Sequence, residues 1–355
     1  MLERVQQLKD APLAPLTTFR LGGPATRLVT ATTDDEVIAA VREAELSGTP
    51  LLVVGGGSNL VISDKGFEGT VLHIATKGFT LDGTTLEVAA GEVWSDVVDR
   101  TVEAGLAGIE CLAGIPGSAG ATPVQNVGAY GQDVAETITE VVVYDTKDHQ
   151  KLTLTNEQCR FSYRHSLFKQ LPGEYVVLRV RFALEDAGGM SAPLAYEQTA
   201  RALGAEMGDR VPLVHARDTV LKLRASKGMV LDPADHDTWS AGSFFTNPIL
   251  ANDEFAVFQK RVAERLGADV RAPAFPVGAS FTKTSAAWLI DKAGFTKGYG
   301  SGPARISTKH TLALTNRGEA TTEDLLALAR EVVAGVRDAF GVTLVNEPVT
   351  IGVRL

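Results

Sequence analysis

Apolar and polar residues follow two periods along the chain, and these periods predict a mixture of helices and strands. The segment 34–47 keeps its apolar residues on one helical face, and Thr33 and Glu36 have the spacing of a capping box. Similar patterns predict helices at about 92–104, 195–206, 212–226, 253–267, 284–293 and 321–340. Alternating or short apolar runs predict strands after Pro24 and at 51–54, 70–74, 84–90, 137–146, 174–184, 306–315 and 343–354.

One stretch follows neither period. The residues from Cys111 to Gly131 have no helical spacing and no strand alternation, and most of them are small. Glycine lets backbone N–H groups approach a ligand closely, and Gln125 and Asn126 add amide donors and acceptors. A plain surface loop is the alternative. Because long structureless loops in compact domains are usually functional or disordered, we favour a ligand cradle.

A second glycine cluster, GGGSN at 55–59, follows the apolar run 51–54. Successive N–H groups in such a turn can converge on an anion. The spacing matches neither the G-x-G-x-x-G dinucleotide fingerprint nor the P-loop, so a tight turn without a ligand fits this cluster equally well. Considered together with the stretch 111–131, however, two cradles suit a ligand that has two phosphates and flat rings.

The length and the middle of the chain predict more than one domain. A chain of 355 residues is long enough for two or three domains. Residues 185–193 lose both the apolar period and the bulky side chains, which places a boundary there. The second half mixes predicted helices and strands, so we expect a mixed α+β unit there and an α+β fold class for the chain.

The composition narrows the classes of function. The net charge of −9 argues against nucleic-acid binding and against docking on an anionic membrane. No apolar run reaches the roughly 18–20 residues that span a bilayer, and the N-terminal residues lack the apolar segment of a secretory signal. The two cysteines, Cys111 and Cys159, do not make a disulfide framework, so reduced thiols in the cytoplasm are the simpler interpretation. No cysteine or histidine spacing is that of a zinc site, so we predict no catalytic metal and interpret His310 as structural.

Three polar side chains near aromatic or apolar residues are candidates for chemistry. Arg164 follows Phe161 and Tyr163, and a partly buried guanidinium must be paired, best with a carboxylate. Ser243 lies in AGSFFTNP, which is no G-x-S-x-G elbow, but a hydroxyl in an apolar wall can donate a proton to a carbanion. Glu347 lies in a predicted strand. The simpler alternatives are an exposed arginine, a serine that caps a turn and a surface glutamate.

The stretch 111–131, together with CRFSYRHS at 159–166 and AGSFFTNP at 241–248, resembles the UDP-N-acetylenolpyruvoylglucosamine reductases (MurB), type I branch. The resemblance implies an FAD-binding PCMH-type domain of the vanillyl-alcohol oxidase-like superfamily at 1–188, made of two α/β subdomains. It implies a mixed α+β substrate-binding domain at 189–355, whose last strand returns toward the flavin. The motif matches extend from residue 17 to residue 352, so the resemblance covers nearly the whole chain.

The same resemblance implies the cofactors and partners. FAD is expected to be bound non-covalently, and NADPH is the expected co-substrate that reduces it. The substrate is UDP-N-acetylglucosamine enolpyruvate, which is reduced to UDP-N-acetylmuramate for peptidoglycan synthesis, and hence for cell-wall biogenesis, cell shape and cell division. We expect a cytoplasmic monomer with no nucleic acid and no membrane insertion. Thr17–Gly22 matches a further segment on the cofactor side, and the expected FAD contacts are Gly55, Gly56, Gly57, Ser58, Asn59, Leu60, Gly114, Ile115, Pro116, Gly117, Ser118, Gly120, Ala121, Thr122, Gln125, Asn126, Gly128, Ala129 and Tyr130.

The resemblance also implies the roles of single residues. Arg164 matches an arginine beside the substrate carboxylate, Ser243 matches the general acid, and Glu347 matches a glutamate that polarises the substrate carboxyl group or relays a proton. The family usually has valine after this glutamate, whereas this chain has Pro348, which restricts Glu347 to extended geometry. The expected substrate contacts are Tyr163, Tyr196, Lys227 and Asn247.

Two alternatives remain at this point. An oxidase of sugars or lactones from the same superfamily would share the first half of the chain, would react quickly with O2, and should lack the set of Arg164, Ser243 and Glu347. A nucleotide-sugar-binding regulatory protein without a redox cofactor would explain the glycine loops and Lys227, but it would be colourless.

Overall fold

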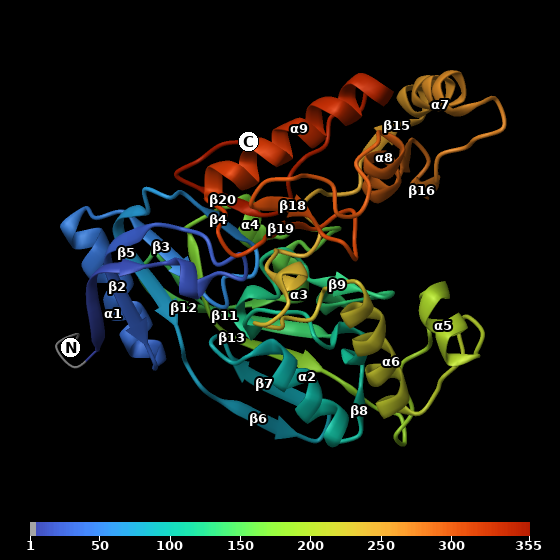
Figure 1. The fold of residues 1–355 in the computed structure, drawn as a ribbon. Helices are drawn as coiled ribbons and strands as arrows, with labels where there is room; N and C mark the ends of the chain where they lie inside the picture. The colour runs from blue at the N-terminus through green and yellow to red at the C-terminus, as the bar shows by residue number, and fades with distance from the viewer. Residues whose placement is uncertain (1–4) are drawn as a thin grey trace. The chain divides into compact units, whose positions relative to one another are not determined.

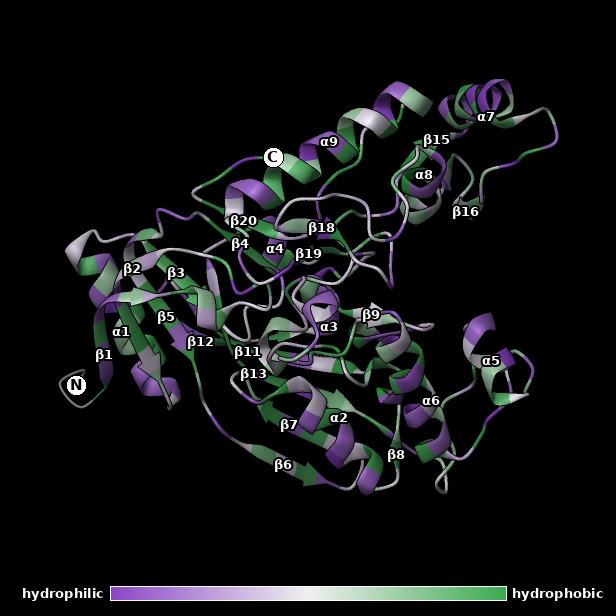
Figure 2. Ribbon diagram, viewed as in Figure 1, coloured by the Kyte–Doolittle hydropathy of each residue, from purple (hydrophilic) through white to green (hydrophobic). Residues whose placement is uncertain are grey.

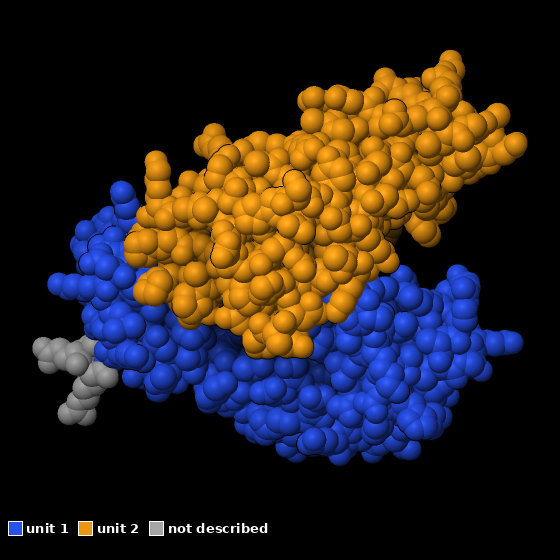
Figure 3. All heavy atoms as spheres, in the orientation of Figure 1, with its two compact units in different colours: residues 1–11, 25–57, 68–230 blue, residues 12–24, 58–67, 231–355 orange. Residues whose placement is uncertain are grey.

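The computed structural model describes residues 5–355, which divide into two compact units. Unit 1 comprises the residues up to Ala11, 25–57 and 68–230, and unit 2 comprises 12–24, 58–67 and 231–355 (Figure 3). The chain therefore enters unit 2 twice before residue 68. The division into domains 1–188 and 189–355, which the sequence and the resemblance predict, stays a prediction.

An antiparallel five-stranded sheet forms the centre of unit 1, in the order β12-β11-β13-β7-β6 (Figure 1). Val180 lies opposite Val141 on one neighbouring strand and opposite Val88 on the other, and all three side chains are fully buried. The alternation over 174–184 thus correctly predicted a strand that is half buried along its length. The strands are β6 (Phe79–Asp82), β7 (Thr85–Ala89), β11 (Ile138–Asp145), β12 (Gln150–Thr155) and β13 (Tyr175–Ala183).

A second sheet has the order β1-β2-β5-β3, with β3 and β5 parallel. Helix α1 (Asp34–Ser47) joins β2 to β3 and begins at the capping box that the sequence predicts. Thr33 Oγ1 accepts from the backbone N–H of Glu36, and the helix ends at Gly48 in the left-handed conformation. The strands are β1 (Gln6–Pro12), β2 (Pro24–Ala31), β3 (Leu51–Val54) and β5 (Phe67–Ile74).

Helices and short strands complete unit 1. Trp94 is 1% exposed and packs against Phe182, with ring centroids 5.9 Å apart, so that α2 is fixed to the central sheet. The helices are α2 (Trp94–Glu103), α3 (Asn156–Cys159), α4 (Leu167–Gln170), α5 (Glu197–Leu203) and α6 (Leu213–Ser226). The two-residue strands are β8 (Leu106–Ala107), β9 (Gly128–Ala129), β10 (Gln132–Asp133) and β14 (Glu185–Asp186).

Unit 2 is built around the long helix α9 (Thr322–Phe340), along which hydrophobic and hydrophilic bands alternate in Figure 2. The Asp64 carboxylate accepts the N–H groups of Thr322 and Glu323, so the residues after β4 cap this helix. Strand β4 also pairs in parallel with β20. The remaining elements are β4 (Leu60–Ile62), β15 (Ile249–Ala251), α7 (Asn252–Leu266), β16 (Phe275–Val277), β17 (Phe281–Lys283), α8 (Ala286–Lys292), β18 (Ala304–Ile306), β19 (Leu314–Asn316) and β20 (Val349–Ile351).

Two predicted strands are observed only in part. The segment 306–315 begins with the last residue of β18 and ends with the first two residues of β19. The residues between them reverse the chain, because Ser307 Oγ accepts the N–H groups of Lys309 and His310. His310 therefore lies in a turn, where its Nδ1 accepts the N–H of Leu312. Within 343–354 only Val349–Ile351 form a strand, so Glu347 precedes it and is not part of it.

Residues 5–355 contain neither a membrane-spanning helix nor a cluster of metal-binding side chains. No helix within residues 5–355 is long and apolar enough to cross a membrane. The same residues contain no group of three or more histidine, cysteine, aspartate or glutamate side chains arranged to hold a metal ion. Cys111 and Cys159 are both free and buried.

Candidate active site

The two glycine clusters meet inside unit 1. A Cβ added at Gly56 would lie 2.6 Å from the Cα of Gly117, and one added at Gly55 would lie 2.2 Å from the Oγ of Ser118. Real Cβ atoms do not come so close. Gly56 meets backbone atoms, so this position requires glycine for the two loops to approach, whereas at Gly55 the Ser118 hydroxyl group would have to move. The two predicted cradles therefore pack directly against each other.

The loop 111–131 is held by backbone hydrogen bonds to the junction between β7 and α2. Trp94 N–H donates to Gly117 O, Ala119 N–H donates to Glu92 O, and Gly120 N–H donates to Ala90 O. A Cβ at Gly120 would lie 2.4 Å from that of Ala90. The loop contains single turns of 3-10 helix, at Glu110–Leu112 and Ala119–Ala121, and the two-residue strand β9, which agrees with its lack of a regular period.

Buried polar side chains hold both ends of this loop. The Glu110 carboxylate is fully buried and accepts the N–H groups of Gly108 and Ala192, each at 2.7 Å. Gln132 Oε1 accepts the N–H of Cys111 at 2.8 Å, which joins the first residue of the loop to the residue after its last. Neither Glu110 nor Gln132 was predicted from the sequence.

Arg164 contacts the same loop. Its guanidinium donates to Asn126 O at 3.2 Å and to Gly128 O at 2.7 Å. The residue lies in a tight turn closed by two hydrogen bonds between Ser162 and His165, and it has a φ of 54°. A non-glycine residue in this region is strained, and such strain is concentrated at functional sites. Arg164 is half buried, as its aromatic neighbours predicted.

A second group of predicted residues gathers around Tyr130, which also has a positive φ of 50°. Its ring lies edge-on to that of Tyr196, with centroids 5.5 Å apart, and Lys227 Nζ lies 5.3 Å from its centroid. Burial raises the pKa of Tyr130. Lys227 Nζ also donates to Gln198 Oε1 at 2.8 Å. Tyr196 and Tyr163 are 43% and 45% exposed, so each can contact a ligand.

In unit 2 the structure joins the segments of Ser243 and Glu347. Glu347 N–H donates to Phe244 O at 2.8 Å, and Phe245 pairs with Asn346 in an antiparallel bridge. Asn59 holds the same segment from the other side, since its Nδ2 donates to Glu347 O and its own carbonyl accepts the N–H of Val349. Two predicted catalytic residues thus lie on hydrogen-bonded neighbouring segments.

The other predicted residues of unit 2 have visible structural partners. Asn247 Oδ1 accepts the N–H of Ala286 at the start of α8. Thr17 Oγ1 donates to Leu21 O, which closes the turn of the segment that matched the cofactor side. The GGGSN cluster is divided, because Gly55–Gly57 belong to unit 1, whereas Ser58, Asn59 and Leu60 belong to unit 2.

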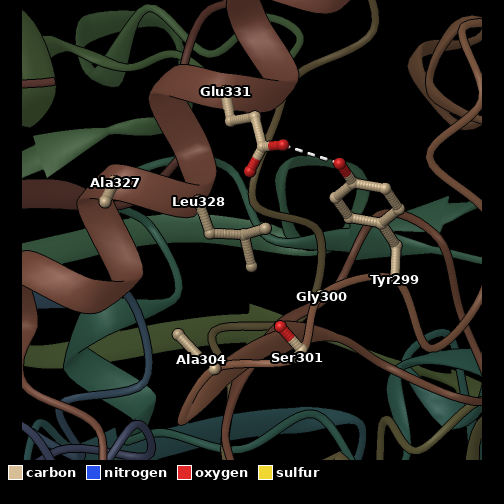
Figure 4. Close-up of a pocket in the computed structure, with 8 residues that line it drawn as sticks. Tyr299, Gly300, Ser301, Ala304, Ala327, Leu328 and Glu331 are labelled. Carbon is tan, nitrogen blue, oxygen red and sulfur yellow. Dashed lines mark hydrogen bonds between the residues drawn. The ribbon is translucent and has the colours of Figure 1, made fainter.

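Unit 2 also contains a pocket of about 500 Å³ beside α9, between Tyr299 and Glu331, whose side chains are joined by a hydrogen bond of 2.6 Å (Figure 4). None of the predicted site residues lines it. We therefore assign the pocket no role in the chemistry of those residues.

The unit 1 loops fit a dinucleotide cofactor with flat rings. Gly55–Gly57, Gly114 and Gly117 expose backbone without side chains, which permits close approach to a pyrophosphate. A Cβ at Gly56 or Gly120 would clash with Gly117 or Ala90, so glycine at these two positions keeps the loops packed in this arrangement. Arg224, an arginine that was not predicted as a site residue, lies beside Gly114. The sequence feature that could have identified Arg224 is its position among the apolar residues on one face of the predicted helix 212–226.

Comparisons with known proteins agree on one family. Residues 232–351 match the C-terminal domain of UDP-N-acetylenolpyruvoylglucosamine reductase, and residues 25–148 match an FAD binding domain. The chain is 78% identical over 354 residues to the UDP-N-acetylenolpyruvoylglucosamine reductase of Streptomyces coelicolor, covering 100% of this chain and 92% of that protein. It is 57% identical over 352 residues to the enzyme of the same name from Thermobifida fusca, covering 98% of each. The solved structure of UDP-N-acetylenolpyruvylglucosamine reductase (MurB) from Thermus caldophilus is similar, with a TM-score of 0.66, 26% identity and coverage of 98% and 99% of the two chains.

Proposed function

The chain belongs to the UDP-N-acetylenolpyruvoylglucosamine reductase family, and from this premise we propose how its residues carry out the reaction. It is an FAD-dependent oxidoreductase of peptidoglycan synthesis that reduces UDP-N-acetylglucosamine enolpyruvate to UDP-N-acetylmuramate, with NADPH as reductant. FAD bound here would supply the redox chemistry, the passage of a hydride from NADPH to the vinyl C3 of the enolpyruvyl group. The protein's own residues must hold the cofactor, stabilise the negative charge that develops on the substrate and protonate C2.

The cofactor is held by the glycine loops of unit 1. Gly55–Gly57, Gly114 and Gly117 leave the backbone of these loops without side chains, which supports close approach of the pyrophosphate and of the flat flavin. The N–H groups of Ala119 and Gly120 bond Glu92 O and Ala90 O instead and hold the loop in place. Ser58, Asn59 and Leu60 follow directly after Gly57 in the chain. The contacts of Asn59 with the Glu347 segment add a second role, since this asparagine also fixes the backbone that carries a catalytic side chain.

Arg164 binds the substrate carboxylate. Hydride addition at C3 leaves negative charge at C2 that is delocalised into this carboxyl group, and a guanidinium is its best planar partner. Arg164 already donates to Asn126 O and Gly128 O. A guanidinium has five N–H donors, so the same bonds that orient the group are compatible with a carboxylate on it. Preoriented donors of this kind stabilise charge in the transition state without a cost of reorganisation.

Ser243 donates the proton to C2, and Glu347 polarises the carboxyl group or relays the proton. Ser243 is half buried beside two fully buried phenylalanines, which limits access of water to its hydroxyl group. The observation that carries this proposal is the hydrogen bond from Glu347 N–H to Phe244 O, because it brings two polar residues that are distant in sequence onto adjacent segments. Pro348 has no N–H to donate, but the bonds of this pairing use the N–H groups of Glu347 and Thr246, so the proline costs none of them.

The nucleotide part of the substrate is held by Tyr163, Tyr196, Lys227 and Asn247. A protein with a net charge of −9 needs a local cation to bind a diphosphate. Lys227 supplies one beside the ring of Tyr130, which in turn packs against the exposed ring of Tyr196. The Oδ1 atom of Asn247 accepts a backbone N–H of α8, which fixes the direction of its amide group.

The reaction has two halves, the reduction of FAD by NADPH and the reoxidation of reduced FAD by the enolpyruvyl substrate. Measuring the rate of each half tests these roles separately. Ser243→Ala should lower the rate at which UDP-N-acetylglucosamine enolpyruvate reoxidises the reduced flavin by a factor of roughly 10² to 10⁴, the range for a lost general acid, and should leave the reduction of FAD by NADPH unchanged. Ser301→Ala, an exposed serine of the same unit, is the control and should change neither rate. An equal loss of both half-reactions in Ser243→Ala would contradict the assigned role.

We further propose that the protein acts as a cytoplasmic monomer and that its functional domains are 1–188 for FAD and 189–355 for the substrate. Sedimentation velocity on the FAD-loaded protein should give a single species close to 37.6 kDa. A stable dimer at micromolar concentration would refute the first part of this proposal.

A further inference from the structure

Asn126 lies where the loop 111–131 meets the turn that carries Arg164. It is 4% exposed and has a φ of 47°. Its backbone carbonyl accepts Arg164 Nη1 at 3.2 Å, and its Nδ2 donates to Ser162 O at 3.3 Å. Asn126 therefore contacts both the guanidinium and the backbone of the turn 162–165.

The side chain of Asn126 has backbone partners on both of its polar atoms. Its Oδ1 accepts the N–H of Ala135 at 3.1 Å, while its Nδ2 donates to Ser162 O. Its own backbone N–H donates to Pro123 O. The resemblance predicts this residue as an FAD contact, whereas the bonds of its side chain connect the loop to the Arg164 turn.

The residue type fits that connection. A positive φ is strained for most side chains, and asparagine tolerates it better than nearly all others. Glycine adopts the same conformation but has no side chain to reach Ser162 O, and an aspartate carboxylate cannot donate to a carbonyl. Asparagine is thus the short side chain that suits this backbone and offers both a donor and an acceptor.

The turn 162–165 needs anchors because Arg164 is itself strained, with a φ of 54°. Directly after the turn, Ser166 Oγ donates to Val124 O, so the far end of the turn is tied to the loop 111–131. The Asn126 amide ties the near end to the same loop. The two ties together fix the backbone from which the guanidinium extends.

We propose that Asn126 is a positioning residue for the reduction of the substrate. Its amide holds the turn 162–165 against the loop, and its carbonyl orients the guanidinium of Arg164 before negative charge develops on the substrate. Donors that are fixed in advance stabilise such charge without a cost of reorganisation. This inference rests on the proposed role of Arg164 and adds a residue that acts through it.

The test removes the amide and leaves the backbone conformation intact. Asn126→Gly removes both side-chain bonds, and glycine adopts this φ without strain. Asn126→Asp keeps an acceptor for the N–H of Ala135 and removes the donor to Ser162 O. Asn156→Ala is the matched control, because the Nδ2 of Asn156 donates to Ala135 O and Ile138 O and holds the region of Ala135 from another side.

We expect both Asn126 variants to slow the reoxidation of reduced flavin by saturating UDP-N-acetylglucosamine enolpyruvate roughly 10- to 100-fold, as for a group misplaced by about 1 Å. The Kd of this substrate should rise by a smaller factor, because the charge on its carboxyl group grows after hydride addition. The rate of FAD reduction by NADPH and the Kd for FAD should stay at the wild-type values. Asn156→Ala should change none of these four quantities.

A double-mutant cycle shows whether Asn126 acts through Arg164. In Arg164→Met the guanidinium is absent, so the further change Asn126→Gly should leave the already low rate of reoxidation as it is. An additional tenfold loss in that background would show that Asn126 acts independently of Arg164 and would overturn the inference.

Three other results would overturn it as well. Equal losses in both half-reactions, or a weaker affinity for FAD, would make Asn126 a cofactor contact or a structural residue. Wild-type rates in both variants would show that the turn holds Arg164 without the amide, and failure of both variants to fold would show a purely structural role. If the substrate did not reoxidise the reduced wild-type protein, the proposed function itself would fail, which is distinct from any difference between the variants.

Discussion

Gly56→Ala is the sharpest perturbation of the proposed cradle. Gly56 does not have a positive φ, so alanine is acceptable to its backbone and the effect comes from space alone. The added Cβ would lie 2.6 Å from Gly117 Cα and 2.9 Å from Gly117 C. Both are backbone atoms, which cannot rotate away as the end of a flexible side chain can.

The magnitude follows from this geometry. Ordinary contact begins at 3.4 Å, so the two loops must separate by about 0.8 Å at their closest point. Overpacking of this kind costs roughly 1–3 kcal/mol. If the loops must be this close when FAD is bound and are free to separate without it, the whole cost weakens binding, and 1.4 kcal/mol corresponds to a factor of ten. We therefore expect the Kd for FAD to rise by a factor of about 5 to 150.

Titration of apoprotein with FAD, followed by flavin fluorescence, measures this effect. Gly302→Ala is the matched control, since a Cβ there meets nothing closer than 3.9 Å and its φ is not positive. The control should bind FAD as wild type does. If Gly56→Ala also bound FAD with wild-type affinity while its far-UV spectrum was unchanged, the glycine clusters would not form the cofactor cradle.

Buried and capping groups elsewhere in the chain give three smaller effects. Thr33→Ala removes the side-chain cap of α1 and should lower the free energy of unfolding by about 1 kcal/mol in urea titrations. Burial raises the pKa of Asp237, but hydrogen bonds from its neighbours and the charge of Arg317 outweigh it and hold the pKa below 3.8. This stabilisation is present above the unfolded pKa and is lost as pH falls through the folded one, so Asp237→Asn should flatten the acid side of a plot of unfolding temperature against pH. Burial raises the pKa of Cys111, and that of Cys159 to about 12, so a thiol reagent such as DTNB should react with neither until the protein is denatured.

The elements that could be predicted are those long enough to show a period. The helix predicted at 34–47 is observed at Asp34–Ser47, and the one predicted at 321–340 at Thr322–Phe340. Strands of two or three residues, such as β9 and β15, show no period and were missed. The predicted strand 306–315 is interrupted because apolar residues flank a turn made by one serine hydroxyl, which hydropathy does not report.

Part of the candidate site could likewise be predicted from the sequence, and part of it could not. Composition alone located the loop 111–131, and the roles of single residues came from resemblance to a family. The pairing of the Ser243 and Glu347 segments could not be predicted, because it depends on hydrogen bonds between residues distant in sequence. Arg224 could have been found from the sequence, since a cation in register with the apolar stripe of a helix calls for a partner. Unless its position on the helix is compared with the apolar stripe, a charged residue in a predicted helix is interpreted as exposed to solvent.

The central claim is that this protein transfers a hydride from NADPH to UDP-N-acetylglucosamine enolpyruvate through FAD. An absorption spectrum of the purified, FAD-loaded protein under anaerobic conditions tests it most directly. We predict oxidised-flavin bands that bleach with NADPH and return when the enolpyruvyl substrate is added. Bands that return only with O2 would indicate an oxidase instead. A protein without flavin bands after incubation with FAD would contradict the claim at its first step.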